Sequence, residues 1–235
     1  MPTPRQEATA ARPGLPPDRA KGEDDTMEHD PRYPILRYTD GQRINHWIVA
    51  MTFVLAALSG LAMFHPAMYW LTNLFGGGPW TRILHPFIGC VMAAAFLSMV
   101  LRFWSHNRIE PRDRQWLKQW RDVVANREER LPEVGKYNGG QKLIFFVLVA
   151  CMLVLFVTGI LFWRPWFADA FPIWLVRLAT LLHAGAATVL IIAIIVHIYA
   201  AIWTKGSIRA MTRGTVSTRW AVRHHRAWFR EKTGQ

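Results

Sequence analysis

Four long apolar segments constrain the fold of this chain more than any other feature. They run from about Trp47 to Phe64, Leu84 to Trp104, Leu143 to Trp163 and Trp174 to Trp203. A helix needs about 20 mostly apolar residues to cross the hydrocarbon core of a bilayer, so each is long enough, the first barely. Because they are apolar on nearly all faces, they lack the polar stripe of a helix bundle in water. We therefore predict an all-α integral membrane protein, a four-helix bundle over residues 37–204.

The distribution of Lys and Arg predicts the orientation of these helices. The 28 Lys and Arg outnumber the 16 Asp and Glu, which gives a formal net charge of +12. They gather between the second and third apolar segments and after the fourth, whereas the other two loops hold little beyond Arg82 and Arg164. The positive-inside rule then places both termini and the central loop in the cytoplasm. Topology explains the excess charge, so we expect lipid and not nucleic acid as the surrounding partner.

The segments outside the apolar core carry weaker signals. Residues 1–36 lack any apolar run and predict a disordered tail that is not a secretory signal peptide. Residues 205–235 are expected to form a basic cytoplasmic tail. Five residues of the central loop recur at helical spacing: Trp116, Leu117, Trp120, Val123 and Val124. They predict a short amphipathic helix within residues 112–126, lying on the membrane or on a partner.

Two histidines on the fourth segment suggest that the bundle holds cofactors. His183 and His197 are fourteen residues apart, so their rings point within roughly 40° of each other, about 21 Å apart along a helix. Ionisable side chains inside a spanning helix are costly and usually functional. His46 begins the first helix at the inner side, and His85 opens the second at the outer side, with Pro86 in its first turn. Matching depths predicts the pairs His85–His183 and His46–His197.

Each histidine pair offers two imidazoles to a metal from opposite sides. Zinc takes three or four protein ligands, and no nearby Cys, Asp or Glu completes such a set. Haem needs only one or two axial ligands, because its ring supplies the other four. Since the C-x-x-C-H attachment motif is absent, we predict two non-covalent, b-type haems. The alternatives are histidines that hydrogen-bond between helices, or a membrane anchor or transporter whose histidines relay protons.

Arginines near both membrane faces are candidate partners of the haem propionates. Propionates favour cationic groups, and these are available as Arg82, Arg164 and Arg177 outside and Arg43 inside. The alternative is that these arginines extend to the lipid headgroups. Four glycines would let a flat macrocycle or a neighbouring helix approach closely: Gly60, Gly89, Gly159 and Gly185.

Five stretches resemble the gamma subunit of bacterial respiratory formate dehydrogenases, a membrane cytochrome b. They are RINHW at 43–47, RILHPF at 82–87, VGKYNGGQK at 134–142, TGILFWRP at 158–165 and WTKGSI at 203–208. The resemblance covers about residues 37–232 and implies two b haems held by the same histidine pairs. It also implies a quinone site next to the inner haem, lined by Asn138, Gly140, Gln141 and His197. From the residues alone, a plain turn and a helix cap is the favoured interpretation of this block.

The resemblance further implies a place in an electron-transfer complex of the bacterial inner membrane. An alpha subunit with molybdenum or tungsten would oxidise formate at the periplasmic side, and an iron–sulfur beta subunit would relay the electrons. This chain would pass them through its haems to menaquinone or ubiquinone at the cytoplasmic side, which contributes to proton-motive force. No catalytic residue for formate oxidation is assigned here. The alternative is the cytochrome subunit of a hydrogenase or of a thiosulfate or polysulfide reductase, and a trimer of heterotrimers is left open.

Overall fold

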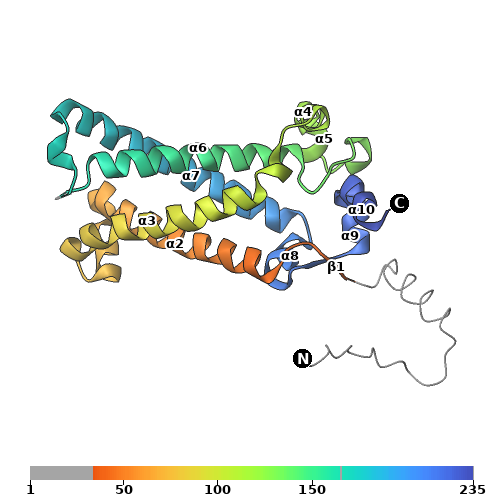
Figure 1. Cartoon of the computed structure of the whole chain (residues 1–235), viewed down its shortest axis with the longest axis horizontal. Helices are drawn as coiled ribbons and strands as arrows, with labels where there is room; N and C mark the ends of the chain where they lie inside the picture. Colours follow the sequence, from red (N-terminus) through yellow and green to blue (C-terminus); the bar gives the residue numbers. More distant parts are fainter. Residues whose placement is uncertain (1–33, 165, 235) are drawn as a thin grey trace, which may run out of the picture.

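Four long helices form the frame of the molecule. The computed structural model describes residues 34–164 and 166–234. Its long helices lie side by side along the longest axis (Figure 1): α2 (Asp40–Phe64), α3 (Gly78–Phe103), α6 (Gly139–Leu161) and α7 (Ile173–Trp203). All four are long and apolar enough to cross a membrane, which confirms the predicted all-α, four-helix membrane bundle.

The helices pack as two antiparallel pairs, α2 with α3 and α6 with α7. Between the pairs lies a buried apolar cluster of Ala56, Met92, Phe96, Val100, Cys151, Met152, Leu155 and Leu190. Cys151 is therefore a small core residue, and both it and Cys90 are free thiols. The outer faces remain apolar, with Leu101 71% and Leu181 70% exposed. Such faces suit lipid, in which apolar side chains need not be covered by protein.

The second spanning helix begins earlier than the apolar run suggested. Gly77 is its N-cap and Pro79 lies in its first turn, where the missing proline N–H breaks no helical bond. Pro86 therefore lies inside α3 and not in its first turn, so that prediction was wrong. Inside a helix, proline removes one backbone hydrogen bond, here beside His85.

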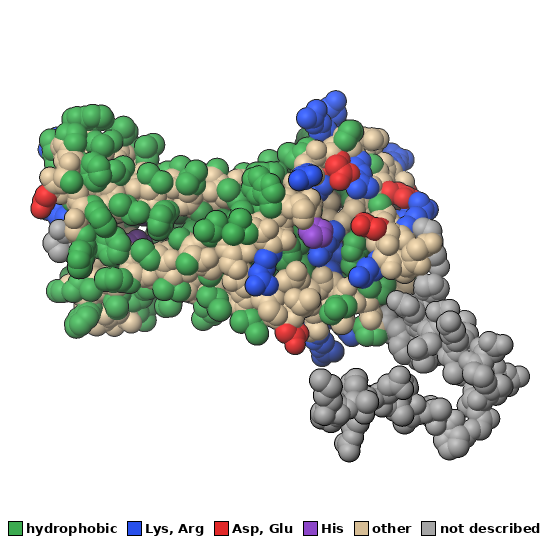
Figure 2. All heavy atoms as spheres, in the orientation of Figure 1, with side chains coloured by type: hydrophobic (Ala, Val, Ile, Leu, Met, Phe, Trp, Pro, Cys, Tyr) green, Lys and Arg blue, Asp and Glu red, His purple; other side chains and the backbone are tan. Residues whose placement is uncertain are grey.

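Short elements cover the two ends of the bundle. The η1 end carries the 3₁₀ helices η1 (Pro66–Phe75) and η4 (Ala168–Ala170). The α10 end carries η2 (Ser105–Asn107), α4 (Pro111–Lys118), α5 (Trp120–Val124), η3 (Glu128–Arg130), α8 (Ser207–Arg213), β2 (Thr215–Ser217), α9 (Thr218–His224) and α10 (Arg226–Thr233). Charged side chains gather at the α10 end, whereas apolar ones cover the bundle (Figure 2). The segment 112–126, predicted as one amphipathic helix, contains parts of two helices, α4 and α5, which are separated at Gln119.

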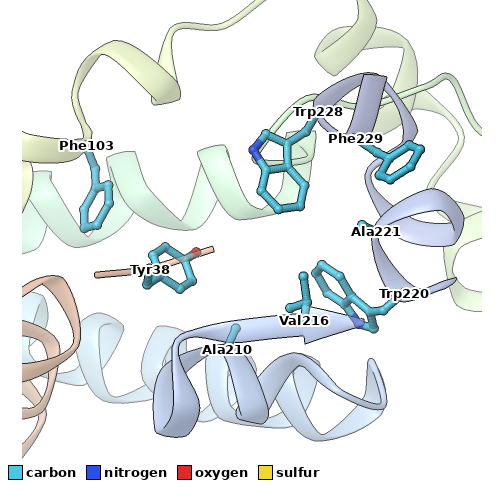
Figure 3. Packing of buried hydrophobic residues seen from close by; sticks show 8 residues of the cluster. All are labelled: Tyr38, Phe103, Ala210, Val216, Trp220, Ala221, Trp228 and Phe229. Atoms are coloured by element: carbon cyan, nitrogen blue, oxygen red, sulfur yellow. The ribbon is translucent and has the colours of Figure 1, made fainter. Parts of the chain in front are cut away.

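Residues at both ends of the described chain fold together at the α10 end. The predicted disordered tail lies outside the described residues up to position 33, but Pro34–Leu36 form strand β1, which pairs antiparallel with β2. The basic segment after residue 204 is likewise folded. Its helices enclose a second apolar cluster, hereafter the end cluster (Figure 3), of Tyr38, Phe103, Ala210, Val216, Trp220, Ala221, Trp228 and Phe229.

Candidate cofactor sites in the bundle

The structure brings the four bundle histidines together in the two predicted pairs. The ring centres of His85 and His183 lie 6.3 Å apart, and those of His46 and His197 lie 6.4 Å apart. A bond from a metal to an imidazole nitrogen is about 2 Å, so two rings on opposite sides of one iron have centres about 6 Å apart. Both pairs have the spacing of axial ligands to one iron. Their role as ligands stays a prediction.

Hydroxyl groups orient the pair nearer the η1 end, His85 and His183, which was predicted to be the outer pair. Ser59 Oγ lies 2.8 Å from the Nδ1 atom of His85 and donates its own proton to the Leu55 carbonyl, 2.8 Å away. Because the hydroxyl proton already forms that bond, the Ser59 oxygen accepts a hydrogen bond from the Nδ1–H group of His85. The Nε2 atom of His85 is then unprotonated and available to a metal. Hydrogen bonds of this kind commonly fix the tautomer of a ligating histidine.

Thr158 does the same for His183 on the opposite helix pair. Its Oγ1 donates to the Val154 carbonyl at 2.6 Å and lies 3.0 Å from the Nδ1 atom of His183. A glycine follows each hydroxyl residue: a Cβ added at Gly60 would lie 3.3 Å from His85 Cε1, and one at Gly159 would lie 3.5 Å from His183 Cε1. The dipeptides Ser59-Gly60 and Thr158-Gly159 therefore form equivalent supports. Neither hydroxyl was predicted from the sequence, although each dipeptide is a polar interruption of an apolar run.

The pair nearer the α10 end, His46 and His197, which was predicted to be the inner pair, is supported differently. The Nδ1 atom of His46 is buried without a hydrogen-bond partner among the described residues, and Trp47 meets its ring edge-on at 5.6 Å. Near the other pair, Cβ atoms added at Gly89, four residues after His85, or at Gly185, two residues after His183, would meet nothing within 4 Å. The described residues contain no group of three or more His, Cys, Asp or Glu able to hold a metal ion. A macrocycle that needs only two axial ligands fits these positions better than zinc does.

The predicted propionate partners fall into two kinds. Arg43 is already engaged, since Nη2 donates to Asp40 Oδ1 at 2.6 Å and Nη1 donates to the Thr212 carbonyl at 2.5 Å. Its Nε is buried and has no hydrogen-bond partner within the described chain. Arg82, Arg164 and Arg177 lie exposed at the η1 end and pair with no carboxylate of residues 34–164 or 166–234.

The predicted quinone residues lie at the start of α6. Asn138 caps the helix, with its Oδ1 accepting from the Gln141 N–H at 2.9 Å, while Gln141 Oε1 accepts from the Asn138 N–H at 3.0 Å. Both amide oxygens are therefore used, which leaves the two side-chain NH₂ groups as donors. Asn138 and Gln141 line a cavity of about 790 Å³ at the α10 end.

The other two predicted quinone residues lie differently. Gly140 is covered by Trp116, because an added Cβ would lie 2.9 Å from that indole ring. Trp116 itself lines the cavity, whereas His197 does not. The structure therefore gathers Asn138, Gln141 and Trp116 at one cavity, with Gly140 behind the indole and His197 outside its lining.

Known proteins are similar in sequence to this chain over most of its length. The prokaryotic cytochrome b561 family matches residues 37–214. The chain is 48% identical over 200 residues to the formate dehydrogenase cytochrome b556(fdo) subunit of Escherichia coli (strain K12), covering 85% of this chain and 94% of that protein. It is 46% identical over 197 residues to the nitrate-inducible cytochrome b556(Fdn) subunit of the same strain, covering 84% and 91%. It is also 41% identical over 198 residues to the Haemophilus influenzae formate dehydrogenase cytochrome b556 subunit, covering 84% and 83%. The chain therefore belongs to the prokaryotic cytochrome b561 family, among the cytochrome b556 subunits of formate dehydrogenases.

Proposed function

We propose that this chain is the membrane cytochrome b subunit of a formate dehydrogenase and carries electrons to quinone through two b haems. The observation that carries the proposal is the pairing of both histidines of α7, His183 with His85 and His197 with His46, at 6.3 and 6.4 Å. Because α7 is unbroken from His183 to His197, fourteen positions later, the two sites lie about 21 Å apart along its axis. Two sites at that separation suit transfer across a membrane.

Each pair would hold one haem b, which supplies one-electron redox chemistry at its iron when bound. The chain contributes orientation at the outer site, where Ser59 and Thr158 keep the Nε2 atoms of His85 and His183 free for the iron. The apolar bundle, with lipid around it, would exclude water from both sites. We assign formate oxidation to a separate catalytic subunit with molybdenum or tungsten, which would pass electrons to this chain through an iron–sulfur partner.

The distribution of charge supports a cytoplasmic α10 end. Of the Lys and Arg that the structure describes, only Arg82, Arg164 and Arg177 lie at the η1 end. By the positive-inside rule, the α10 end faces the cytoplasm and the His85–His183 site faces the periplasm. Electron flow from the iron–sulfur partner would then run inward, at a cost of about 2.3 kcal/mol per electron against 100 mV. The drop in potential from formate to quinone supplies this work, so turnover contributes to proton-motive force.

Quinone reduction takes two electrons and two protons and yields the quinol. We place it at the α10 end, where the free NH₂ groups of Asn138 and Gln141 can donate hydrogen bonds to a quinone carbonyl. These donors stand at the N-terminus of α6, where the helix dipole stabilises the negative charge that develops on the carbonyl oxygen. Protons would enter from the cytoplasmic side of the same cavity.

A haem count on the purified membrane complex tests the proposal. We expect two b haems per chain by pyridine haemochrome, and one in a His197→Ala variant that still shows formate-dependent reduction of the remaining haem. His65→Ala is the control, because His65 lies outside the bundle pairs. Retention of both haems in His197→Ala would overturn the ligand assignment. Membranes that reduce quinone with hydrogen, thiosulfate or polysulfide and not with formate would overturn the choice of complex.

A further inference from the structure

The loop before α6 is held by two buried residues from the opposite ends of the chain. Arg37, just after β1, donates from Nη2 to the Lys136 carbonyl at 2.6 Å. His225, between α9 and α10, lies with its Nδ1 atom 2.8 Å from the Gly135 carbonyl. The two side chains also meet each other, with Arg37 Nη2 3.2 Å from His225 Nε2. Two successive carbonyls, two and three residues before Asn138, are therefore bound by one connected unit.

The hydrogen bonds of this unit allow only one tautomer of His225. A guanidinium only donates, so Nε2 of His225 must accept from Arg37. The proton is then on Nδ1, which donates to the Gly135 carbonyl. Burial and the neighbouring charge of Arg37 lower the pKa of His225 to about 3, so the ring stays neutral and keeps this tautomer at cellular pH.

The position of the Arg37 guanidinium is strongly constrained. Arg37 is 5% and His225 2% exposed, and the Arg37 Cζ atom lies 4.8 Å from the ring centres of both Trp220 and Trp228. A buried charge is costly unless hydrogen bonds and aromatic faces stabilise it, so a displaced guanidinium would lose these contacts. The cation is consequently fixed between the end cluster and the loop.

The side chains of the loop divide between the end cluster and the cavity. Tyr137 packs edge-on against Phe103 at 6.2 Å, and the Lys136 ammonium lies 5.5 Å from the ring centre of Tyr38. The next residue, Asn138, lines the cavity and forms the capping box with Gln141. The backbone position of Gly135 and Lys136 therefore sets where the two amide groups stand.

We propose that Arg37 and His225 are positioning residues of the quinone site. By holding the carbonyls of Gly135 and Lys136, they fix the direction in which the Asn138 and Gln141 amides face the cavity. The inference rests on the proposed function, since it assumes that quinone binds at these amides. The inference also assigns a role to the folded C-terminal segment. The junction of α9 and α10 places His225 against a loop 90 residues earlier in the chain.

The test compares two polar substitutions in the intact complex. His225→Gln places an amide near the Nε2 position and loses the donor to Gly135, whereas the amide of His225→Asn stands near Nδ1 and retains it. We expect His225→Gln to raise the KM for a short-chain quinone analogue about tenfold, since small misplacements of binding groups have effects of this size. His225→Asn should stay close to the parent. Haem content and formate-dependent haem reduction should be unchanged in both.

Two further variants distinguish the positioning role from a general loosening of the end cluster and from a wrong location of the quinone site. Phe229→Leu loosens the same end cluster without touching the loop carbonyls, and its KM should remain at the parent value. An equal rise in KM for Phe229→Leu, or equal behaviour of His225→Gln and His225→Asn, would overturn the positioning role. If Asn138→Ala leaves the quinone kinetics unchanged, the proposed location of the quinone site is wrong, and the positioning role falls with it.

Discussion

Lys142 Nζ lies 2.7 Å from Asp113 Oδ2, and the two side chains are 5% and 2% exposed. The same ammonium donates to the Arg108 carbonyl at 2.9 Å, and Asp113 Oδ2 also accepts from the Glu110 N–H at 2.8 Å. The pair therefore attaches α4 to the first turn of α6. This places Trp116 over Gly140, at the wall of the cavity that Asn138 and Gln141 line.

Breaking this ion pair on one side should destabilise the α10 end strongly. Lys142→Met leaves the Asp113 carboxylate buried without its cation, a change that costs about 3–5 kcal/mol in comparable buried pairs. We expect a lower thermal midpoint for the detergent-solubilised protein. Arg127→Ala, which removes an exposed partner 3.6 Å from Asp122, should leave the midpoint nearly unchanged. Equal midpoints for both variants would contradict the structural role of the buried pair.

Removing the hydroxyl beside His85 should alter the outer haem and spare the inner one. In Ser59→Ala the His85 Nδ1–H loses its acceptor, and losses of this kind lower metal affinity about 10–100-fold. Redox titration of the two haems should therefore show a changed potential or partial loss at one site only. Thr52→Ala is the matched control, because Thr52 makes the same bond to the carbonyl four residues earlier, at 2.7 Å, and has no hydrogen bond to a histidine that the structure describes. A titration identical to the parent's would remove Ser59 from the site.

The histidine pairs were predictable because depth in a membrane helix follows from residue number. A fixed rise per residue, together with the positive-inside rule, was enough to match His85 with His183. Ser59 and Thr158 were not predictable in this way. A hydroxyl in an apolar helix ordinarily hydrogen-bonds to a carbonyl of its own helix. Its contact with a histidine becomes visible only when the packing of the neighbouring helix is known.

The end cluster could not be predicted because its contacts are distant in sequence. Residues 205–235 were interpreted through their Lys and Arg, yet Trp220 and Trp228 are buried against Tyr38 and Phe103. Their burial depends on β1 pairing with β2 across some 180 residues. The position of Arg37 could not be predicted for the same reason. Nothing in the sequence around a single arginine before a spanning helix indicates that it contacts two indole rings.

Asn138→Ala should slow quinone reduction while both haems remain. The substitution removes one donor NH₂ group and also the cap of α6, and loss of a cap costs about 1 kcal/mol. Thr39→Ala controls for that second effect, because Thr39 forms the equivalent capping box at the start of α2. Steady-state formate-to-quinone turnover should fall in Asn138→Ala and remain near the parent value in Thr39→Ala. Equal turnover in the two variants would mean that capping alone explains the effect.

Acid should destabilise the α10 end through His225. Burial, and then the charge of Arg37, lower its pKa from the ordinary 6.5 to about 3, so between these values the unfolded chain binds a proton that the folded chain does not. The contribution of neutral His225 to the free energy of unfolding is therefore complete above about pH 6.5. It falls as the pH drops toward 3, by at most about 1.4 kcal/mol per pH unit. Thermal midpoints measured from pH 7.5 to 5 should decline less steeply in His225→Asn, which keeps the bond to Gly135 and has no titrating ring. The same pH slope in this variant and the parent would assign the acid sensitivity to another group.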